Sequence, residues 1–293
     1  MTVSSIYKVQ PKEDIIRLEL ELTSFCNLKC PLCIREITNV TNKNIHRPLK
    51  EVIDQINEYP NLKYVTIAGA ISEPTSYPDL FDLIIYLGKR DLELSLYING
   101  DTRDDDYYTK LGALFRTVNG EVYFTICGST QELHERYRVN SKLDRVLRRL
   151  DIVNKWSGNK GILTWIVFDY NEQDFLENYQ QYREKYTTEY FYTLPMAEHF
   201  QLKSTIKLPD RLNKIYTKNI DRQDFDNIYC PANKNNFIQI TFDGQVNPCS
   251  LYRLYGEQHC WECSEKNLAT LRNNKIFNCA EPESETSEQP LRL

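Results

Sequence analysis

Apolar positions in the first two thirds of the chain follow two alternating patterns. Short stretches such as IRLELE at 16–21 and YVTIA at 64–68 have the alternating or continuous apolar character of β-strands. Between them lie longer stretches whose apolar residues recur every three or four positions, as in a helix with one buried face. The patterns predict strands over 16–21, 64–68, 92–98, 122–126, 162–168 and 190–194, and helices over 48–59, 80–87, 105–115, 143–156 and 172–184.

The helix over 143–156 has the clearest pattern, and Ser141 stands before it as a predicted N-cap. A strand followed by a helix, about six times over, is typical of parallel βα units. Six units are too few for a closed eight-stranded barrel of about 250 residues. The sequence therefore predicts an α/β fold, a partial (β/α)6 barrel of parallel strands, with its active site at the carboxyl ends of the strands.

The pattern changes from about residue 221. A strand pair over 237–242 and 245–247, with a turn at Asp243-Gly244, lies among cysteines, and a short helix is predicted over 269–277. The last residues are acidic and lack periodicity. We expect a barrel over 1–220, a small cysteine-rich domain with a β-hairpin and a short helix over 221–279, and a disordered acidic tail over 280–293.

Composition excludes several classes of protein. Hydrophobic residues make up 41% and charged residues 26% of the chain, and the formal net charge is −5, so a globular fold is expected without a basic surface for nucleic acid. No apolar run has the length of about 20 residues that a membrane helix needs, and the N-terminal residues lack the apolar core of a signal peptide. A cytoplasmic location is predicted. Nine cysteines in a reducing compartment indicate metal or redox chemistry rather than disulfides.

The first cysteine group directly follows the first predicted strand. Cys26, Cys30 and Cys33 form a C-x3-C-x2-C sequence, and three thiolates on one loop can hold three corners of a cubane iron–sulfur cluster. One iron would then be open to another ligand. On spacing alone, a zinc site with a distant fourth ligand and unrelated free thiols remain alternatives.

Further motifs occur in a fixed order around these cysteines. TSFCNLKCPLC, IAGAISEPTSYPDL, LYINGD, VYFTICGSTQELHERYR and WIVFDYNEQD follow one another within residues 15–200. In this order they resemble the motifs of the radical S-adenosylmethionine (SAM) superfamily. The resemblance implies that the open iron chelates SAM. One electron would then cleave the sulfur–C5′ bond, and the 5′-deoxyadenosyl radical would take a hydrogen from substrate.

The resemblance also implies a set of SAM contacts. Gly69 and Glu73 match the glycine-rich loop that receives the SAM ammonium, and Asn99 and Thr125 match polar contacts at strand ends. Arg138 matches the arginine that pairs with the SAM carboxylate. The resemblance therefore implies that the residues in contact with SAM are Leu32, Gly69, Glu73, Asn99, Thr125 and Arg138.

Two positions depart from the family's pattern. Leu32 stands where an aromatic residue usually lies beside the adenine, so stacking is replaced by an apolar wall. Cys127 stands where many relatives have Asp. It could face substrate, but we interpret it as a buried, inert thiol, because free cysteine packs as a small hydrophobic residue.

The second cysteine group resembles the C-terminal SPASM or twitch extension of this superfamily. Its pattern is Cys230, then Gly244-x4-Cys249, then Cys260-x2-Cys263. The resemblance implies one auxiliary [4Fe–4S] cluster held by Cys230, Cys249, Cys260 and Cys263, with Cys279 as a spare. A zinc ribbon is the alternative. Ser250 follows Cys249, where sulfatase-maturing relatives carry Asp, which counts against that activity.

The combined expectation is a radical SAM enzyme with an auxiliary cluster for electron transfer. We expect oxidation or redox-neutral modification of a small polar substrate such as a sugar, cyclitol or nucleotide-like molecule, because only about 15 residues precede the first strand. A peptide-modifying maturase or epimerase is the alternative, and a non-enzymatic iron–sulfur or zinc protein is the alternative of another class. The expected partner is an external one-electron donor of flavodoxin or ferredoxin type, without nucleic acid or membrane.

Overall fold

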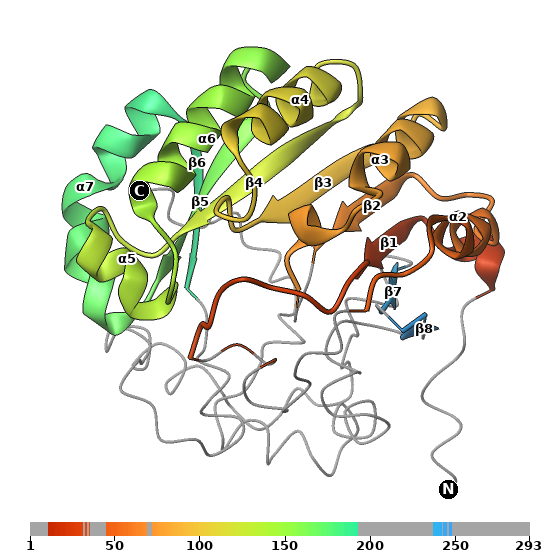
Figure 1. Ribbon diagram of the computed structural model, residues 1–293, viewed down its shortest axis with the longest axis horizontal. Helices are drawn as coiled ribbons and strands as arrows, with labels where there is room; N and C mark the ends of the chain where they lie inside the picture. Colours follow the sequence, from red (N-terminus) through yellow and green to blue (C-terminus); the bar gives the residue numbers. More distant parts are fainter. Residues whose placement is uncertain are drawn as a thin grey trace, which may run out of the picture.

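The strands of the chain form one open sheet, which confirms the predicted partial barrel (Figure 1). The computed structural model describes residues 11–31, 33, 35, 45–68, 72–192, 237–241, 243, 244, 246 and 247. Six strands follow in spatial order and pair in parallel. They are β1 (Arg17–Leu20), β2 (Tyr64–Ile67), β3 (Glu93–Ile98), β4 (Gly120–Ile126), β5 (Gly161–Val167) and β6 (Thr187–Tyr192).

The predicted C-terminal hairpin extends this sheet. β7 (Phe237–Ile240) pairs in parallel with β1, and β8 (Val246–Asn247) pairs antiparallel with β7. The strand order is therefore β6-β5-β4-β3-β2-β1-β7-β8, and in the described part of the chain its two ends do not meet. The domain boundaries stay a prediction, and the helix over 269–277 and the tail lie outside the described residues.

The helices cover one face of the sheet, as Figure 1 shows. They are α2 (Leu49–Asn57), α3 (Leu80–Lys89), α4 (Asp105–Phe115), α6 (Leu143–Ser157) and α7 (Glu172–Lys185), and the short α5 (Gln131–Tyr137) lies between β4 and α6 in sequence. Alternate strand residues, including Leu96, Phe124 and Trp165, are buried in one core with these helices. The residues between them form the other, inner face of the sheet.

Local side-chain contacts fix where the helices begin and end. Asp104 caps α4 by accepting a hydrogen bond from the backbone N–H of Tyr107 at 2.9 Å. Gly158 ends α6 in the left-handed conformation with φ 79°. The prediction that Ser141 caps α6 is wrong: the N-cap is Lys142, without a side-chain cap, and the Ser141 hydroxyl instead contacts His134 Nε2 at 2.9 Å.

The short helix α5 was not predicted. It has seven mostly polar residues, so an apolar period is absent, and it depends on Thr130, whose hydroxyl accepts a hydrogen bond from the Leu133 N–H. α5 carries the chain from β4 back across the end of the sheet and ends at Arg138. No helix among the described residues is long and apolar enough to cross a lipid bilayer.

Candidate functional site

The loop after β1 carries the three clustered cysteines. Cys26, Cys30 and Cys33 form no disulfide within the described part of the chain, and all three are partly exposed. The Cys33 N–H donates to the Cys30 carbonyl at 3.0 Å, which folds the C-x2-C part into a turn, and Arg35 Nη1 donates to the Cys26 carbonyl at 2.9 Å. The loop thus starts at the carboxyl end of the parallel strands, where the sequence predicted the site.

The three thiols lie within electrostatic reach of one another. Burial, and after it the charges of the Glu73 carboxylate and Cys33, raise the pKa of Cys26 to about 11. Burial likewise raises the pKa of Cys30 to about 12, against the favourable charge of Arg138. In the metal-free protein Cys26 and Cys30 are therefore protonated thiols at neutral pH, so metal binding must displace their protons.

The donor set fits an iron–sulfur cluster. Cysteine thiolates are the ordinary ligands of such clusters, and a coordinating thiol is deprotonated outright by the metal charge. Within the described ranges, no three His, Cys, Asp or Glu side chains converge on a single metal ion. Three thiolates that bind three different irons of a cubane do not need to converge on one point. Cys230, Cys249, Cys260, Cys263 and Cys279 lie outside the described residues, so their cluster stays a prediction.

Asn99 joins the end of β3 to the cysteine loop. Its Nδ2 donates to Asn27 Oδ1 at 2.8 Å and lies 3.9 Å from Cys26 Sγ. Its Oδ1 accepts from the Asp101 N–H at 2.8 Å, and the Thr102 hydroxyl also donates to Asn27 Oδ1 at 3.0 Å. The predicted role of Asn99 as a SAM contact stays untested; the side chain positions the loop beside Cys26.

The chain turns sharply after Asn99. Gly100 has φ 73°, and a Cβ at this position would lie 2.8 Å from the Phe124 ring and 3.2 Å from Val146. Only glycine fits this combination of backbone angle and close packing. The turn brings the Asp101 carbonyl to Asn27 Nδ2 at 3.2 Å.

Asp101 anchors this turn to α6. Its carboxylate accepts from the Lys142 N–H at 2.9 Å and from Arg149 Nη1 at 3.1 Å. Burial, the largest influence, raises the pKa of Asp101, and Arg145 and Arg149 oppose it. The network holds the end of β3 rigidly below the cysteine loop.

Glu73 is buried between the cysteine loop and β3. Its Oε1 accepts from the Thr75 N–H and hydroxyl, and its Oε2 accepts from the Asn99 N–H at 2.8 Å. Its own N–H donates to the Phe25 carbonyl at 2.8 Å. Burial raises its pKa. These contacts fasten three loops together, and a contact to the SAM ammonium stays a prediction. Gly69 and Leu32 lie outside the described residues.

Arg138 and Cys127 form a second buried group beside the loop. The Arg138 side chain hydrogen-bonds the Cys127 thiol and lies close to Cys30, while its Nε is buried without a hydrogen-bond partner. Cys127 packs with Ile166 and Phe168 and is fully buried, as the interpretation of an inert thiol requires. Burial raises its pKa to about 11. A guanidinium with an unused N–H suits a carboxylate ligand.

His134 holds the backbone of Cys127 in place. Its Nδ1 accepts the Cys127 N–H at 3.3 Å, so Nε2 carries the proton and donates to Ser141 Oγ. Burial and the charge of Arg138 lower the pKa of His134 to about 3. Asn171 Nδ2 donates to the Cys127 carbonyl at 2.8 Å. The roles of Asn27, Asp101, His134 and Asn171 were not predicted from the sequence. The only signal for Asp101 was its place directly after a strand and a glycine.

Thr125, the remaining predicted SAM contact, lies on the inner face of β4. It pairs with Thr164 of β5 and is nearly buried.

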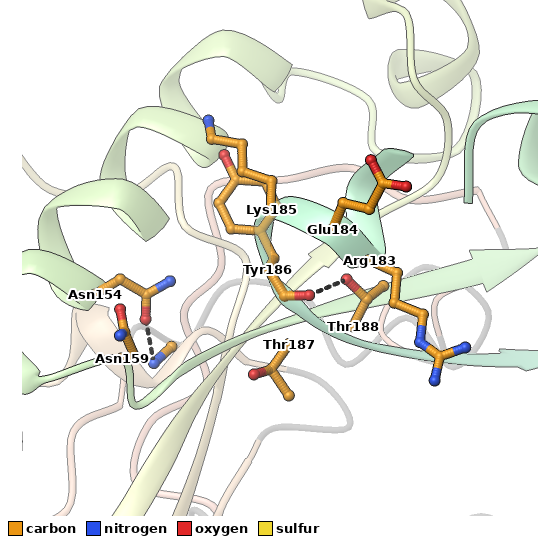
Figure 2. A pocket seen from close by; sticks show the side chains of 9 residues that line it. Asn154, Asn159, Arg183, Glu184, Lys185, Tyr186, Thr187 and Thr188 are labelled. Atoms are coloured by element: carbon orange, nitrogen blue, oxygen red, sulfur yellow. Dashed lines mark hydrogen bonds between the residues drawn. The ribbon is translucent and has the colours of Figure 1, made fainter. Parts of the chain in front are cut away.

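A cavity near the opposite end of the strands lies away from these residues. It is lined by α6, α7 and β6 residues such as Asn154, Arg183 and Thr187, as Figure 2 shows. Thr187 begins β6, so this cavity opens at the amino end of the sheet. We assign it no part in the site.

Sequence comparison identifies the family. The model of the radical SAM superfamily matches residues 20–181, more than half of the chain. A tungsten-containing aldehyde ferredoxin oxidoreductase cofactor-modifying protein of Pyrococcus furiosus is 31% identical over 98 residues, 33% of this chain and 27% of its own length. The mycofactocin maturase MftC of Mycobacterium tuberculosis is 29% identical over 136 residues, 46% of this chain and 33% of its own. The chain thus spans about a third of the length of these curated relatives.

Solved structures share the fold. Streptococcus suis SuiB bound to S-adenosylmethionine superposes with a TM-score of 0.60 and 16% identity, over 89% of this chain and 69% of that one. Native anSMEcpe with bound AdoMet and Cp18Cys peptide superposes with a TM-score of 0.59 and 18% identity, over 88% of this chain and 83% of that one. With the cysteine loop, the partial barrel and the family match in agreement, the chain belongs to the radical SAM superfamily.

Proposed function

We propose that the chain is a radical SAM enzyme that modifies a peptide. The observation that carries the proposal is the convergence of the three loop cysteines, the buried Asn99 clamp and the guanidinium of Arg138 at one end of an open parallel barrel. When bound, the [4Fe–4S] cluster supplies the electron that cleaves SAM to the 5′-deoxyadenosyl radical. The protein's task is to position SAM and exclude water.

The described residues divide this task among them. Cys26, Cys30 and Cys33 would hold the cluster, and Asn99 would keep their loop fixed against β3 through Asn27. Arg138 would pair with the SAM carboxylate, since its Nε has no hydrogen-bond partner within the described ranges. Glu73, Thr125, Gly69 and Leu32 remain proposed SAM contacts. Because the Glu73 carboxylate is already buried and held by hydrogen bonds from Thr75 and Asn99, little rearrangement of this residue is needed for binding.

A peptide substrate is favoured over the small polar molecule expected from the sequence. SuiB has been solved bound to the precursor peptide SuiA, with a TM-score of 0.56 to this chain, and MftC is named a maturase. This similarity of fold and sequence supports a peptide. An auxiliary cluster at Cys230, Cys249, Cys260 and Cys263 and an external one-electron donor belong to the proposal as well.

Anaerobic reconstitution with iron and sulfide, followed by SAM and dithionite, tests the proposal. The wild-type chain is expected to form 5′-deoxyadenosine and to bind about eight irons if both cubanes assemble. Replacing Cys26, Cys30 and Cys33 by Ala should abolish 5′-deoxyadenosine and remove about four irons. Cys127→Ala is the matched control, because Cys127 is buried and free, and its iron content should equal that of wild type.

Two results would contradict the proposal. Absence of 5′-deoxyadenosine from an iron-loaded wild-type protein would exclude radical SAM activity. Stoichiometric zinc with about four irons would replace the auxiliary cluster by a zinc site.

A further inference from the structure

The inner face of the sheet is polar, although a parallel sheet ordinarily has two apolar faces. Its residues are those that alternate with the helix-covered core: Glu19 of β1 is level with Thr66, Ser95 and Glu121 on the next strands, and Thr125 of β4 is level with Thr164 and Glu189. Polar groups gathered on a concave face beside a reaction centre are typical of a binding site.

This face carries an excess of carboxylates. Glutamate occupies four of its strand positions, at Glu19, Glu93, Glu121 and Glu189. Within the described strands its one basic residue is Arg17, whose guanidinium lies over the Tyr64 ring, 4.0 Å from the centroid, near the amino end. The centre of the face is therefore negatively charged and lacks a cation of its own among the described residues.

Three of the carboxylates surround a pair of stacked tyrosines. The rings of Tyr97 and Tyr123 lie 4.2 Å apart at an angle of 10°, and the Tyr123 hydroxyl donates to Glu121 Oε2 at 2.8 Å. Burial raises the pKa of Tyr97, and the charges of Glu189, Glu121 and Glu19 contribute. All three carboxylates are thus close to the Tyr97 hydroxyl. Aromatic rings beside carboxylates are a favourable environment for a cation.

Two buried polar atoms of this face have no hydrogen-bond partner among the residues that the structure describes. Thr164 Oγ1 stands between Thr125 and Glu189 in the sheet register, and its residue is fully buried. Gln239 Oε1 is also unpaired in a fully buried side chain, while its Nε2 donates to Glu19 Oε1 at 2.8 Å. A buried polar atom without a partner is energetically unfavourable, so a ligand that supplied donors here would remove that cost.

Gln239 Oε1 is an acceptor, the Thr164 hydroxyl oxygen can accept as well as donate, and ionised carboxylates accept only. The complementary ligand is a donor-rich cation. We propose that the inner face around Tyr97, Thr164 and Glu189 binds a basic side chain of the peptide substrate, a lysine ammonium or an arginine guanidinium. This inference rests on the proposed function for its reaction, but the binding itself does not depend on SAM cleavage. Thr125, a proposed SAM contact, lies in the same row as Thr164 and Glu189, so the bound side chain lies next to the radical's place of origin.

Calorimetric titration of the anaerobic reconstituted enzyme with SAM tests the inference. The probes are the N-acetyl N-methylamides of lysine, arginine and norleucine, which compare two cations with an uncharged side chain. The better of the two cations is expected to bind about tenfold more tightly than norleucine, as one charge-assisted hydrogen bond provides. The preference between lysine and arginine identifies the cation.

Two variants locate the binding site. Glu189→Gln is expected to reduce the preference over norleucine to about twofold or less, and Thr164→Val, which keeps the shape, should weaken the cation several-fold. Glu184→Gln removes an exposed carboxylate from the end of α7, outside the inner face, and should bind like wild type. SAM affinity should be the same in all of them.

Equal binding of all three probes by wild type would overturn the inference. So would identical behaviour of Glu189→Gln and Glu184→Gln, or a loss of SAM affinity in Glu189→Gln, which would assign the carboxylate to SAM. Formation of 5′-deoxyadenosine is measured in the same preparation. Its absence with an intact cation preference would reject the proposed reaction and leave the binding site standing.

Discussion

Asp101 fixes the turn beneath the cysteine loop, and its removal should destabilise the barrel strongly. Its carboxylate is fully buried and accepts from the Lys142 N–H and from Arg149 Nη1. The Arg149 side chain is only 6% exposed, so its charge cannot turn to solvent. Arg145, which lies 2.9 Å from the same carboxylate, is 41% exposed and can do so.

The expected loss follows from Arg149. Asp101→Ala leaves the buried Arg149 guanidinium with only Asp105, 3.6 Å from its Nε and 38% exposed, as a carboxylate partner among the described residues. The cost is therefore expected at the lower end of that for breaking a buried pair, about 3 kcal/mol. In a domain of this size, each kcal/mol lowers Tm by about 2–4 °C. The variant is therefore expected to melt roughly 6–12 °C below wild type.

Circular dichroism melts of three variants test this reasoning. Asp101→Asn keeps an acceptor for the Lys142 N–H but loses the charge, so its Tm should be intermediate. Lys50→Ala removes an exposed ion pair with Asp54 and should change stability by about 0.5 kcal/mol or less. If Asp101→Ala melts within about 2 °C of Lys50→Ala, the buried pair does not stabilise the turn and the reasoning is refuted.

Three more predictions concern single residues. Gly100→Ala should lower stability by about 1–3 kcal/mol, because the new Cβ would meet Phe124 at a positive φ; an unchanged Tm would contradict this. Stability should fall by about 2 kcal/mol from pH 7 to pH 5 through His134, because the unfolded imidazole takes up a proton near pH 6.5 and the folded one does so only near pH 3. In urea titrations at several pH values, the free energy of unfolding of His134→Gln should lack this part of the pH dependence. If its dependence on pH equals that of wild type, the prediction is refuted. Cys127, fully buried, should react with iodoacetamide far more slowly than Cys33 in the apo protein when followed by peptide mass spectrometry; equal rates would show that it is accessible.

The pattern of apolar residues was sufficient to predict the βα order and most element positions. The helix over 105–115 agrees with α4, and the strand over 92–98 agrees with β3 to one residue. The strand predicted over 190–194 begins three residues earlier, at Thr187. The first three residues, Thr187, Thr188 and Glu189, are polar, so the apolar pattern did not include them. α5 was missed for a similar reason: a side-chain cap, and not an apolar period, determines it.

The contacts that the candidate-site residues make were harder to predict than the places of these residues along the strands. The sequence places Asn99 at a strand end, but its partner Asn27 is 72 residues away, so the clamp emerges only after folding. Ser141 has the residue type of an N-cap, yet its hydroxyl contacts His134. The inner face could be recognised only from the register of the strands, because alternate polar residues are also typical of an exposed strand.

Because β7 pairs with β1, the sheet around β1 can be completed only late in the synthesis of the chain. β1 is completed at Leu20, but one of its two neighbours ends at Ile240. A growing chain therefore exposes one edge of the strand that leads into the cysteine loop until more than two hundred further residues have been made. Unpaired strand edges favour aggregation. A shortened chain ending before β7 would contain all of residues 20–181, which the family model matches, and still leave this edge open.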